Sequence, residues 1–395
     1  MNSLDIMNKN KIIQCHECAL LVHLPTLKLS QKAQCPRCGL VLSAMHDNAL
    51  ERIMVFAITA LIFLILSFVF DFLAFSRNGL ENSFSLLESL HILINNNYHI
   101  LAAIEIITVF IVPMMILLIL VYLSFYLFKG KFPPKGHHLL RIVYALLPWS
   151  MVEIFLIGAL VSIIKIVSMA DIYLGMSFYS FALYSLFITL VVLHLDKQQF
   201  TQLLNDSMLQ QAASSKLSET DNCSNKHLAR SQHSIQQTWA FIFTAIIVYI
   251  PANIMPIMTT RAFGQDEPST ILGGVILLWE MGSFPIALII FIASIVVPIA
   301  KIVIISWLNY TVQKKQYGLT SPRIKLYRLA EFIGRWSMID VFVVIILASM
   351  IQLGDTMSIY PGKAILAFCG VVILTMLAAM SFDSSLIWPT KNNDC

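Results

Sequence analysis

Four cysteines near the N-terminus have the spacing of a metal site. Cys15 and Cys18 form one C-x2-C pair, sixteen residues separate it from a second pair, Cys35 and Cys38, and Gly39 follows. Two tight turns can each present two thiolates to one tetrahedral ion, and so short a segment cannot bury a core without such a cross-link. The pattern predicts a structural zinc ribbon, because four cysteine ligands leave no open position for catalysis. Two disulfides are the alternative, which a reducing cytosol disfavours.

A second candidate site is a repeated motif that carries one carboxylate. The run PWSMVEIF at 148–155 returns as RWSMIDVF at 335–342, and each copy opens a long apolar segment. Glu153 and Asp340 hold the same place in the two copies. A charge inside hydrocarbon is costly, so such residues face a bundle interior or a wet cavity. We expect a paired proton-binding or gating site near a pseudo-twofold axis; the alternative is a carboxylate that bonds to a helix terminus or a neighbouring tryptophan.

Two lysines also lie in apolar segments. Lys165, at the far end of the third span, could bind an anionic headgroup or exchange protons, and snorkelling of its long side chain to the interface is the alternative. Lys301 is deeper, within VVPIAKIVIISWL, and its counterpart in the first copy is Ile116. We expect these lysines to line a polar interior together with Glu153 and Asp340.

Prolines interrupt the fifth span. Pro251, Asn253 and Pro256 lie in YIPANIMPIM and predict a broken helix, whose freed carbonyls need protein or water partners. Broken helices often mark transport sites. A proline-kinked packing element is the alternative.

The elements that must position these residues are membrane spans. Of the 395 residues, 58% are hydrophobic and only 12% charged, with a mean hydropathy of +0.78, whereas soluble domains have about 25% charged residues. Eight apolar segments have roughly the 20 residues that cross a bilayer: 53–72, 100–128, 141–166, 172–195, 239–258, 284–310, 330–353 and 359–381. We predict an all-α polytopic membrane protein of two parallel four-helix transmembrane repeats with an N-terminal zinc ribbon.

The duplication sets the expected domain order. We predict a cytosolic zinc ribbon at 1–48 and a first four-span repeat at 49–196. A cytosolic linker follows at 197–236, for which a degenerate second ribbon is the alternative, and a second four-span repeat occupies 237–395. Lysine and arginine concentrate on one side of the predicted spans, in 1–52, 129–141, 196–236 and 310–335. The positive-inside rule places these segments, and therefore both termini, in the cytosol.

Several other chemistries lack their sequence motifs. We find no G-x-x-x-x-G-K-[ST] loop, nucleophile elbow or H-E-x-x-H helix, so we expect neither a self-powered pump nor an enzyme. The net charge of +4 indicates no nucleic-acid partner, because lysine and arginine are sorted by membrane side and form no basic face. The N-terminus has no apolar h-region after its charges and is not expected to be a secretory signal peptide.

Four features occur together: the C-x2-C…C-x2-C ribbon, the duplicated four-span unit, PWSM-x-E-IFLIG-x-LVS-x-IKI in the third span, and IMPIM…TIL-x-G in the fifth. In this combination the chain resembles the paraquat-inducible protein A family of Gram-negative inner membranes over nearly its whole length. Members usually carry a second cysteine ribbon before the second repeat, where this chain has only Cys223. The resemblance implies a multi-pass protein of the inner (cytoplasmic) membrane that works with a periplasm-spanning mammalian-cell-entry-domain partner to move lipids between the two membranes.

We therefore expect this protein to load or unload membrane phospholipids for that periplasmic conduit. Two other classes stay open. In one, the chain is a proton-coupled exporter of amphiphilic toxicants and acts without a partner; in the other, it is a non-transporting membrane anchor that recruits the conduit. Without a nucleotide-binding loop, energy would come from a proton gradient, a partner or the lipid gradient itself.

Overall fold

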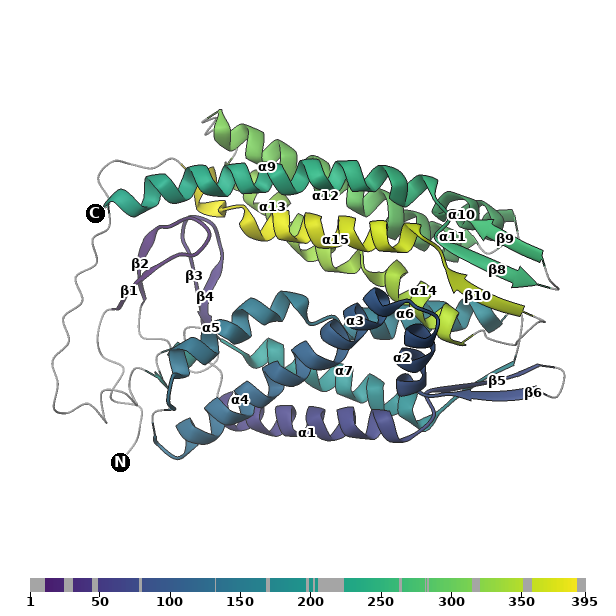
Figure 1. Cartoon of the computed structure of the whole chain (residues 1–395). Helices are drawn as coiled ribbons and strands as arrows, with labels where there is room; N and C mark the ends of the chain where they lie inside the picture. Colours follow the sequence, from purple (N-terminus) through teal and green to yellow (C-terminus); the bar gives the residue numbers. More distant parts are fainter. Residues whose placement is uncertain are drawn as a thin grey trace.

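The computed structural model (Figure 1) is a bundle of long helices with a small N-terminal domain. It describes residues 11–24, 31–44, 49–77, 80–131, 133–167, 171–196, 199–201, 203–204, 224–262, 265–280, 282, 284–314, 320–350 and 357–388. The N-terminal domain consists of two antiparallel hairpins, β1 with β2 and β3 with β4: β1 Lys11–Gln14, β2 Leu21–Leu24, β3 Lys32–Gln34 and β4 Val41–Ala44.

Two repeats with the same order of elements follow. The first consists of α1 Ala49–Val69, β5 Leu73–Arg77, β6 Leu80–Phe84, α2 Leu86–Asn95, α3 His99–Glu105, η1 Ile106–Ile111, α4 Val112–Phe128, α5 Gly136–Leu146, η2 Leu147–Trp149, α6 Val152–Val167, β7 Asp171–Leu174 and α7 Met176–His194. The second consists of α9 Ser224–Ile254, β8 Met258–Ala262, β9 Gln265–Ser269, α10 Ile271–Glu280, α11 Phe284–Phe291, η3 Ile292–Val296, α12 Val297–Gln313, α13 Thr320–Trp336, α14 Ile339–Met350, β10 Met357–Pro361, α15 Ala364–Ser381 and η4 Ser384–Ile387.

Eight helical segments of the described chain are long and apolar enough to cross a membrane. They are Leu50–Val69, His99–Phe128, Gly136–Ile164, Met176–His194, His233–Ile254, Ala287–Gln313, Pro322–Ser349 and Ala364–Ser381. This confirms the predicted architecture of two four-span repeats. Of the linker interval 197–236, the part at 205–223 lies outside the described residues, and α9 begins at Ser224.

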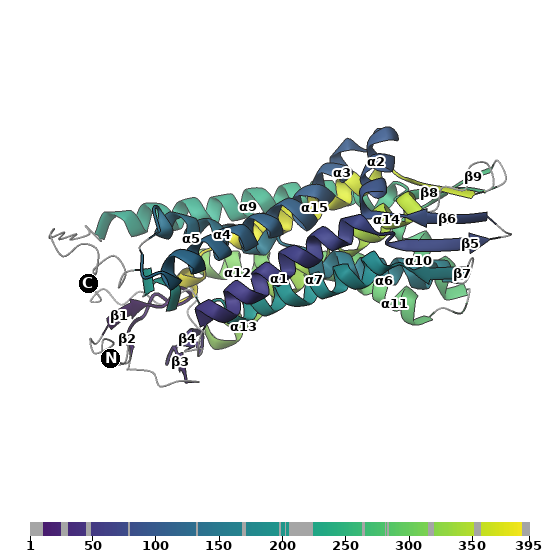
Figure 2. The same cartoon turned by 90° about the horizontal axis from the view of Figure 1, so that it is seen from below.

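Each repeat also contains a three-stranded antiparallel sheet that the sequence did not predict. The strand orders are β6-β5-β7 and β10-β8-β9, and Figures 1 and 2 both show the sheets at the end of the bundle opposite the N-terminal domain. We call these ends the sheet end and the ribbon end. One glycine closes each sheet against its first span: a Cβ on Gly175 would collide with the carbonyl of Asp71, and one on Gly362 with the carbonyl of Pro256. No other residue fits either turn.

The two repeats share one hydrophobic core, and equivalent helices meet at its centre. α6 packs on α14, where the rings of Phe155 and Phe342, which occupy equivalent positions of the repeated motif, lie 5.5 Å apart edge to face. Gly158 allows the close approach, because a Cβ there would lie 3.1 Å from the Cβ of Phe342. A hydroxyl completes the contact, since Ser162 Oγ donates to the carbonyls of Gly158 and Val343. A pseudo-twofold axis therefore passes between the two phenyl rings.

Four of the predicted spans are not continuous α-helices. The second and sixth spans each contain a π-helical segment, η1 and η3, placed just before Pro113 and Pro298. A proline has no N–H to donate into the preceding turn, which favours a local change of helical register at this point. The third and seventh spans break within the repeated W-S-M motif, between α5 and α6 and between α13 and α14. The motif found by sequence repetition is thus a pair of helix breaks.

Candidate functional site

The four N-terminal cysteines converge on one point. The Sγ atoms of Cys15 and Cys38, and those of Cys18 and Cys35, lie 3.5 Å apart, and all four lie within 4.8 Å of one another. Zinc bonded tetrahedrally to sulfur at about 2.3 Å would hold its ligands about 3.8 Å apart, whereas a disulfide needs about 2 Å. All four cysteines are free. The donor set fits a single metal ion, and the disulfide alternative does not hold.

Two matching turns position the cysteines. In each hairpin the residue after the second cysteine is left-handed, with φ of 54° at Ala19 and 70° at Gly39. Their N–H groups donate to the carbonyls of Cys15 and Cys35, at 2.9 Å in both turns. Glycine takes this conformation freely, while alanine is strained in it.

The pKa values of the cysteine thiols indicate how tightly they hold the protons that a bound metal would replace. Burial raises the pKa of Cys38 to about 12 and also raises that of Cys18, because the thiolate form loses its hydration. Burial acts on Cys35 in the same direction, but hydrogen bonds from the N–H groups of Cys38 and Arg37 outweigh it, and the pKa of Cys35 is lowered. A bound metal takes the place of the thiol protons, so metal binding weakens as the pH falls.

The N-terminal domain docks on the second repeat, although the chain joins it to the first. Arg328 of α13 donates from Nε to the Glu17 carboxylate at 3.0 Å and from Nη2 to the Cys38 carbonyl at 3.0 Å. The Arg37 guanidinium lies 4.6 Å from the ring centre of Trp388, beyond η4. The buried cysteines and Leu42 share a hydrophobic cluster with residues of the second repeat: Leu308, Ile324, Phe382, Ile387 and Trp388. The metal-binding turns are therefore part of this interface.

The predicted carboxylates have different surroundings. Glu153 is exposed and accepts a hydrogen bond from Thr189 Oγ1 of α7 at 2.6 Å. Asp340 is buried at 6% exposure and accepts a hydrogen bond from Ser294 Oγ, in the π-helical segment η3. Because Phe155 and Phe342 pack across the axis two residues later, both carboxylates lie near it. They face separate environments, and their predicted roles in proton binding or gating stay predictions.

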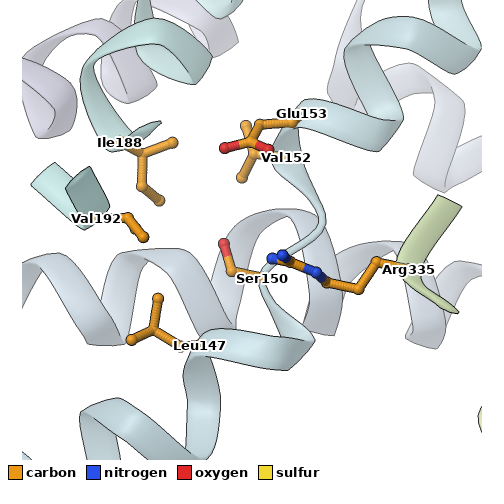
Figure 3. Close-up of a pocket in the computed structure, with 7 residues that line it drawn as sticks. All are labelled: Leu147, Ser150, Val152, Glu153, Ile188, Val192 and Arg335. Carbon is orange, nitrogen blue, oxygen red and sulfur yellow. The ribbon is translucent and has the colours of Figure 1, made fainter. Parts of the chain in front are cut away.

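Glu153 lines a pocket between the two repeats. The pocket has a cavity volume of about 30 Å³ and is open to its surroundings; it is lined by Leu147, Ser150, Val152, Glu153, Ile188, Val192 and Arg335. Figure 3 shows the guanidinium of Arg335 extending from α13 toward Ser150, at the break before α6. Arg335 is the only one of these residues from the second repeat. The pocket thus combines a carboxylate, a guanidinium and two hydroxyls, those of Ser150 and of Thr189 behind Glu153, with apolar walls.

Lys301 is not among the residues that line this pocket. Lys301 is 1% exposed, and its Nζ donates to Thr375 Oγ1 at 2.8 Å and to the Gly334 carbonyl at 3.4 Å. No ion pair with a carboxylate is found for it within the described chain. Lys165 lies in α6, but its side chain is outside the described residues.

The predicted break in the fifth span is instead the end of that span. α9 continues through Pro251 and ends at Ile254, two residues before Pro256, and β8 follows. The side-chain amide of Asn253 donates to the Tyr249 carbonyl at 2.9 Å and so satisfies a carbonyl in this last turn. Pro251 has no N–H to donate to the carbonyl of Ile247, and it lies within the last turn of α9. A role of this segment in transport stays a prediction.

Sequence reasoning missed two functional candidates. Arg335 escaped notice because its partners lie in the other repeat, far away in sequence. Glu105, at the end of α3, is fully buried; Ser89 donates to its Oε1 at 3.5 Å, and no partner within the described chain contacts its Oε2. Ser89 Oγ also lies 3.0 Å from Ser349 Oγ, and this hydrogen bond connects the Glu105 carboxylate to α14. The available signal was its position as the one acidic residue of an otherwise apolar span.

Comparison with known proteins agrees with the duplication. The family model of the paraquat-inducible protein A family matches residues 50–204 and again residues 235–391. The chain is 37% identical to the intermembrane transport protein PqiA of Escherichia coli K12, over 96% of this chain and 95% of that protein. It is 28% identical to the lipophilic envelope-spanning tunnel protein A of the same organism, over 95% and 90%, and 27% identical to a probable intermembrane transport protein of Haemophilus influenzae, over 96% of each. No solved structure matches the chain.

Proposed function

This chain belongs to the paraquat-inducible protein A family, and we propose that it is an inner-membrane component of a system that transports lipids between the two membranes of a Gram-negative envelope. The observation that carries the proposal is similarity along nearly the whole chain to a protein named for intermembrane transport. The similarity spans both repeats, so it includes the pocket between them. The proposed role requires no catalysis by the chain.

The pocket supports lipid handling rather than mere anchoring. Glu153 is exposed within a membrane-spanning segment, where an isolated charge is costly unless it has a polar partner or ligand. Val192, which forms one wall, is 38% exposed, and its neighbour Leu193 is 67% exposed. The pocket therefore borders an apolar surface of the kind that lipid tails cover.

We assign the ribbon end to the cytosol, because lysine and arginine concentrate there. The sheet end then faces the periplasm and would contact a mammalian-cell-entry-domain conduit, which receives or delivers the lipid. We also propose that the ion at the four cysteines is Zn²⁺ with a structural role. Its ligand set is complete without solvent, and the turns that hold it are docked against the second repeat.

The transport role can be tested in cells that lack the chain. Phospholipid is pulse-labelled at the inner membrane, and its distribution between the two membranes is followed with and without the restored chain, while a photoreactive residue at exposed Ser83, in β6, reports protein contacts at the sheet end. We expect the chain to change the transfer rate and Ser83 to capture a periplasmic conduit protein. Conduit capture with an unchanged transfer rate would instead support the anchor class, and an effect on toxicant flux alone would support the exporter class.

A further inference from the structure

The pocket between the repeats presents two opposite charges that do not pair with each other. Glu153 and Arg335 both line it, yet no ion pair joins them in the described chain. Resting on the proposed lipid-transport function, we infer that this pocket binds the headgroup of a zwitterionic phospholipid with a primary amine, of the phosphatidylethanolamine class. Arg335 binds the phosphate, and Glu153 accepts hydrogen bonds from the ammonium group.

The pocket lies at the depth of lipid headgroups. Thr189, the partner of Glu153, is five residues from His194 at the ribbon end of α7, which is about 8 Å along a helix. Next to Arg335, Phe332 and Trp336 are 57% and 41% exposed, and their rings lie 6.3 Å apart. Exposed aromatic rings of this kind are typical of the boundary between hydrocarbon and headgroups. The pocket therefore faces the leaflet at the ribbon end.

The chemistry of the pocket favours one class of headgroup. A guanidinium binds phosphate oxygens through two parallel hydrogen bonds, and a carboxylate accepts from an ammonium N–H. A choline headgroup has no N–H to donate to Glu153, and a glycerol headgroup brings no cation to offset that carboxylate. A primary-amine headgroup matches both charges.

The equivalent positions of the second repeat do not carry the same pair of charges. The position that corresponds to Arg335 is Pro148 in the first copy, so no guanidinium reaches the environment of Asp340 from there. Asp340 is buried and bonded to Ser294 within its own repeat. The proposed headgroup pocket therefore combines the carboxylate of the first repeat with the arginine of the second.

The test compares two neighbouring positions in the full chain. A photoreactive residue replaces either Val192, in the pocket wall, or Leu193, beside it on the exposed face, and each protein is reconstituted in vesicles of equal parts phosphatidylethanolamine, phosphatidylcholine and phosphatidylglycerol. Mass spectrometry then identifies the captured lipids. We expect phosphatidylethanolamine to be enriched about fivefold at position 192 over position 193, the ratio that one exposed charge pair of about 1 kcal/mol would give.

Substitutions assign the selectivity to the two charges. Glu153→Gln should remove the preference for the primary amine over choline, and Arg335→Gln should lower capture of all three lipids at position 192. Glu88→Gln and Arg52→Gln change exposed charges elsewhere and should leave the ratio intact. Equal lipid ratios at positions 192 and 193 in the unsubstituted background would overturn the inference, whether or not the variants fold. Equal ratios together with a transfer rate that depends on the chain would leave the proposed function standing, while selective capture with no effect of the chain on transfer would refute that function and keep the pocket.

Discussion

The two copies of the W-S-M motif show how a duplicated element can diverge while its fold is kept. In both copies a helix break precedes a carboxylate, and Phe155 and Phe342 still pack across the axis. Glu153 opens into a pocket, whereas Asp340 is sealed by Ser294 from a π-helical turn. The motif therefore specifies the helix break, whereas the packing of the neighbouring helices determines whether its carboxylate is accessible.

A similar asymmetry separates the ends of the two repeats. The N-terminal domain is joined in sequence to the first repeat, but it is bound by α13 and η4 of the second. In the second repeat, Asp340 and Lys301 are both buried, and the N-terminal domain is docked on this repeat. In the first repeat, the corresponding carboxylate, Glu153, is exposed. Substitutions made in one repeat at a time test this difference between the repeats.

Loss of a metal ligand should have the largest effect. Cys35→Ser is expected to abolish metal binding and unfold the N-terminal domain, because binding of structural zinc contributes roughly 10 kcal/mol to folding. Elemental analysis should show metal lost, and hydrogen exchange should rise in α13 near Arg328 while α1 keeps its protection. Cys369→Ser, at a buried free cysteine of α15, is the control and should retain the metal. Equal exchange in α1 and α13 would contradict docking on the second repeat alone.

Exchanging the lysine between the repeats should have the next largest effect. Ile116→Lys places an amine in the core of the first repeat, where Ile116 is 1% exposed, and should cost about 3 kcal/mol. Lys301→Met should change stability by less than about 1 kcal/mol, because Thr375 keeps its hydrogen bond to the Val372 carbonyl. Thermal unfolding of the purified chain measures both. Similar losses for the two variants would show that the repeats do not differ in this respect.

The two carboxylates should differ in their contribution to stability. Asp340→Ala should lower the free energy of unfolding by about 2 kcal/mol, because it removes the buried hydrogen bond to Ser294, and Glu153→Ala by less than about 1 kcal/mol, because Glu153 is exposed. Ser294→Ala should produce part of the Asp340 loss and should not add to it in the double variant. Thermal unfolding again provides the measurement, and a larger loss for Glu153→Ala would reverse the comparison.

The smallest effect concerns the two metal-binding turns. Ala19→Gly should stabilise the metal-bound domain by up to about 1 kcal/mol, about fivefold in metal affinity, because it relieves a left-handed alanine. Gly39→Ala should weaken affinity by a similar factor, since no atom lies within 4 Å of the position that the added Cβ would take and only the backbone is strained. Competition with a chelator measures both, and the affinity of each should fall as the pH is lowered, because buried thiols regain their protons. Equal effects of both substitutions in the same direction would contradict this reasoning.

The fold could be predicted from the sequence wherever the signal was local. The C-x2-C spacing, the length of the apolar segments and the repeated motif each specify a structure within a few tens of residues, and all three are found in the structure. The six strands at the sheet end were missed because five residues between long apolar runs give too little periodicity to distinguish a strand from a loop. The position of Pro251 was misjudged for a related reason, since a proline near the end of a helix has the same sequence signal as one that breaks it.

The sequence alone specified the four-cysteine cluster, the eight apolar spans and the duplication, because cysteine spacing, hydrophobic length and repetition are properties of short segments. Only the tertiary structure decided that Arg335 joins Glu153 in one pocket, that Ser294 seals Asp340, that Glu105 is buried and that Arg328 binds Glu17. Most of these contacts join residues far apart in the chain. Their formation depends on how whole helices pack, and no local pattern records which side chain a distant helix will bring into contact.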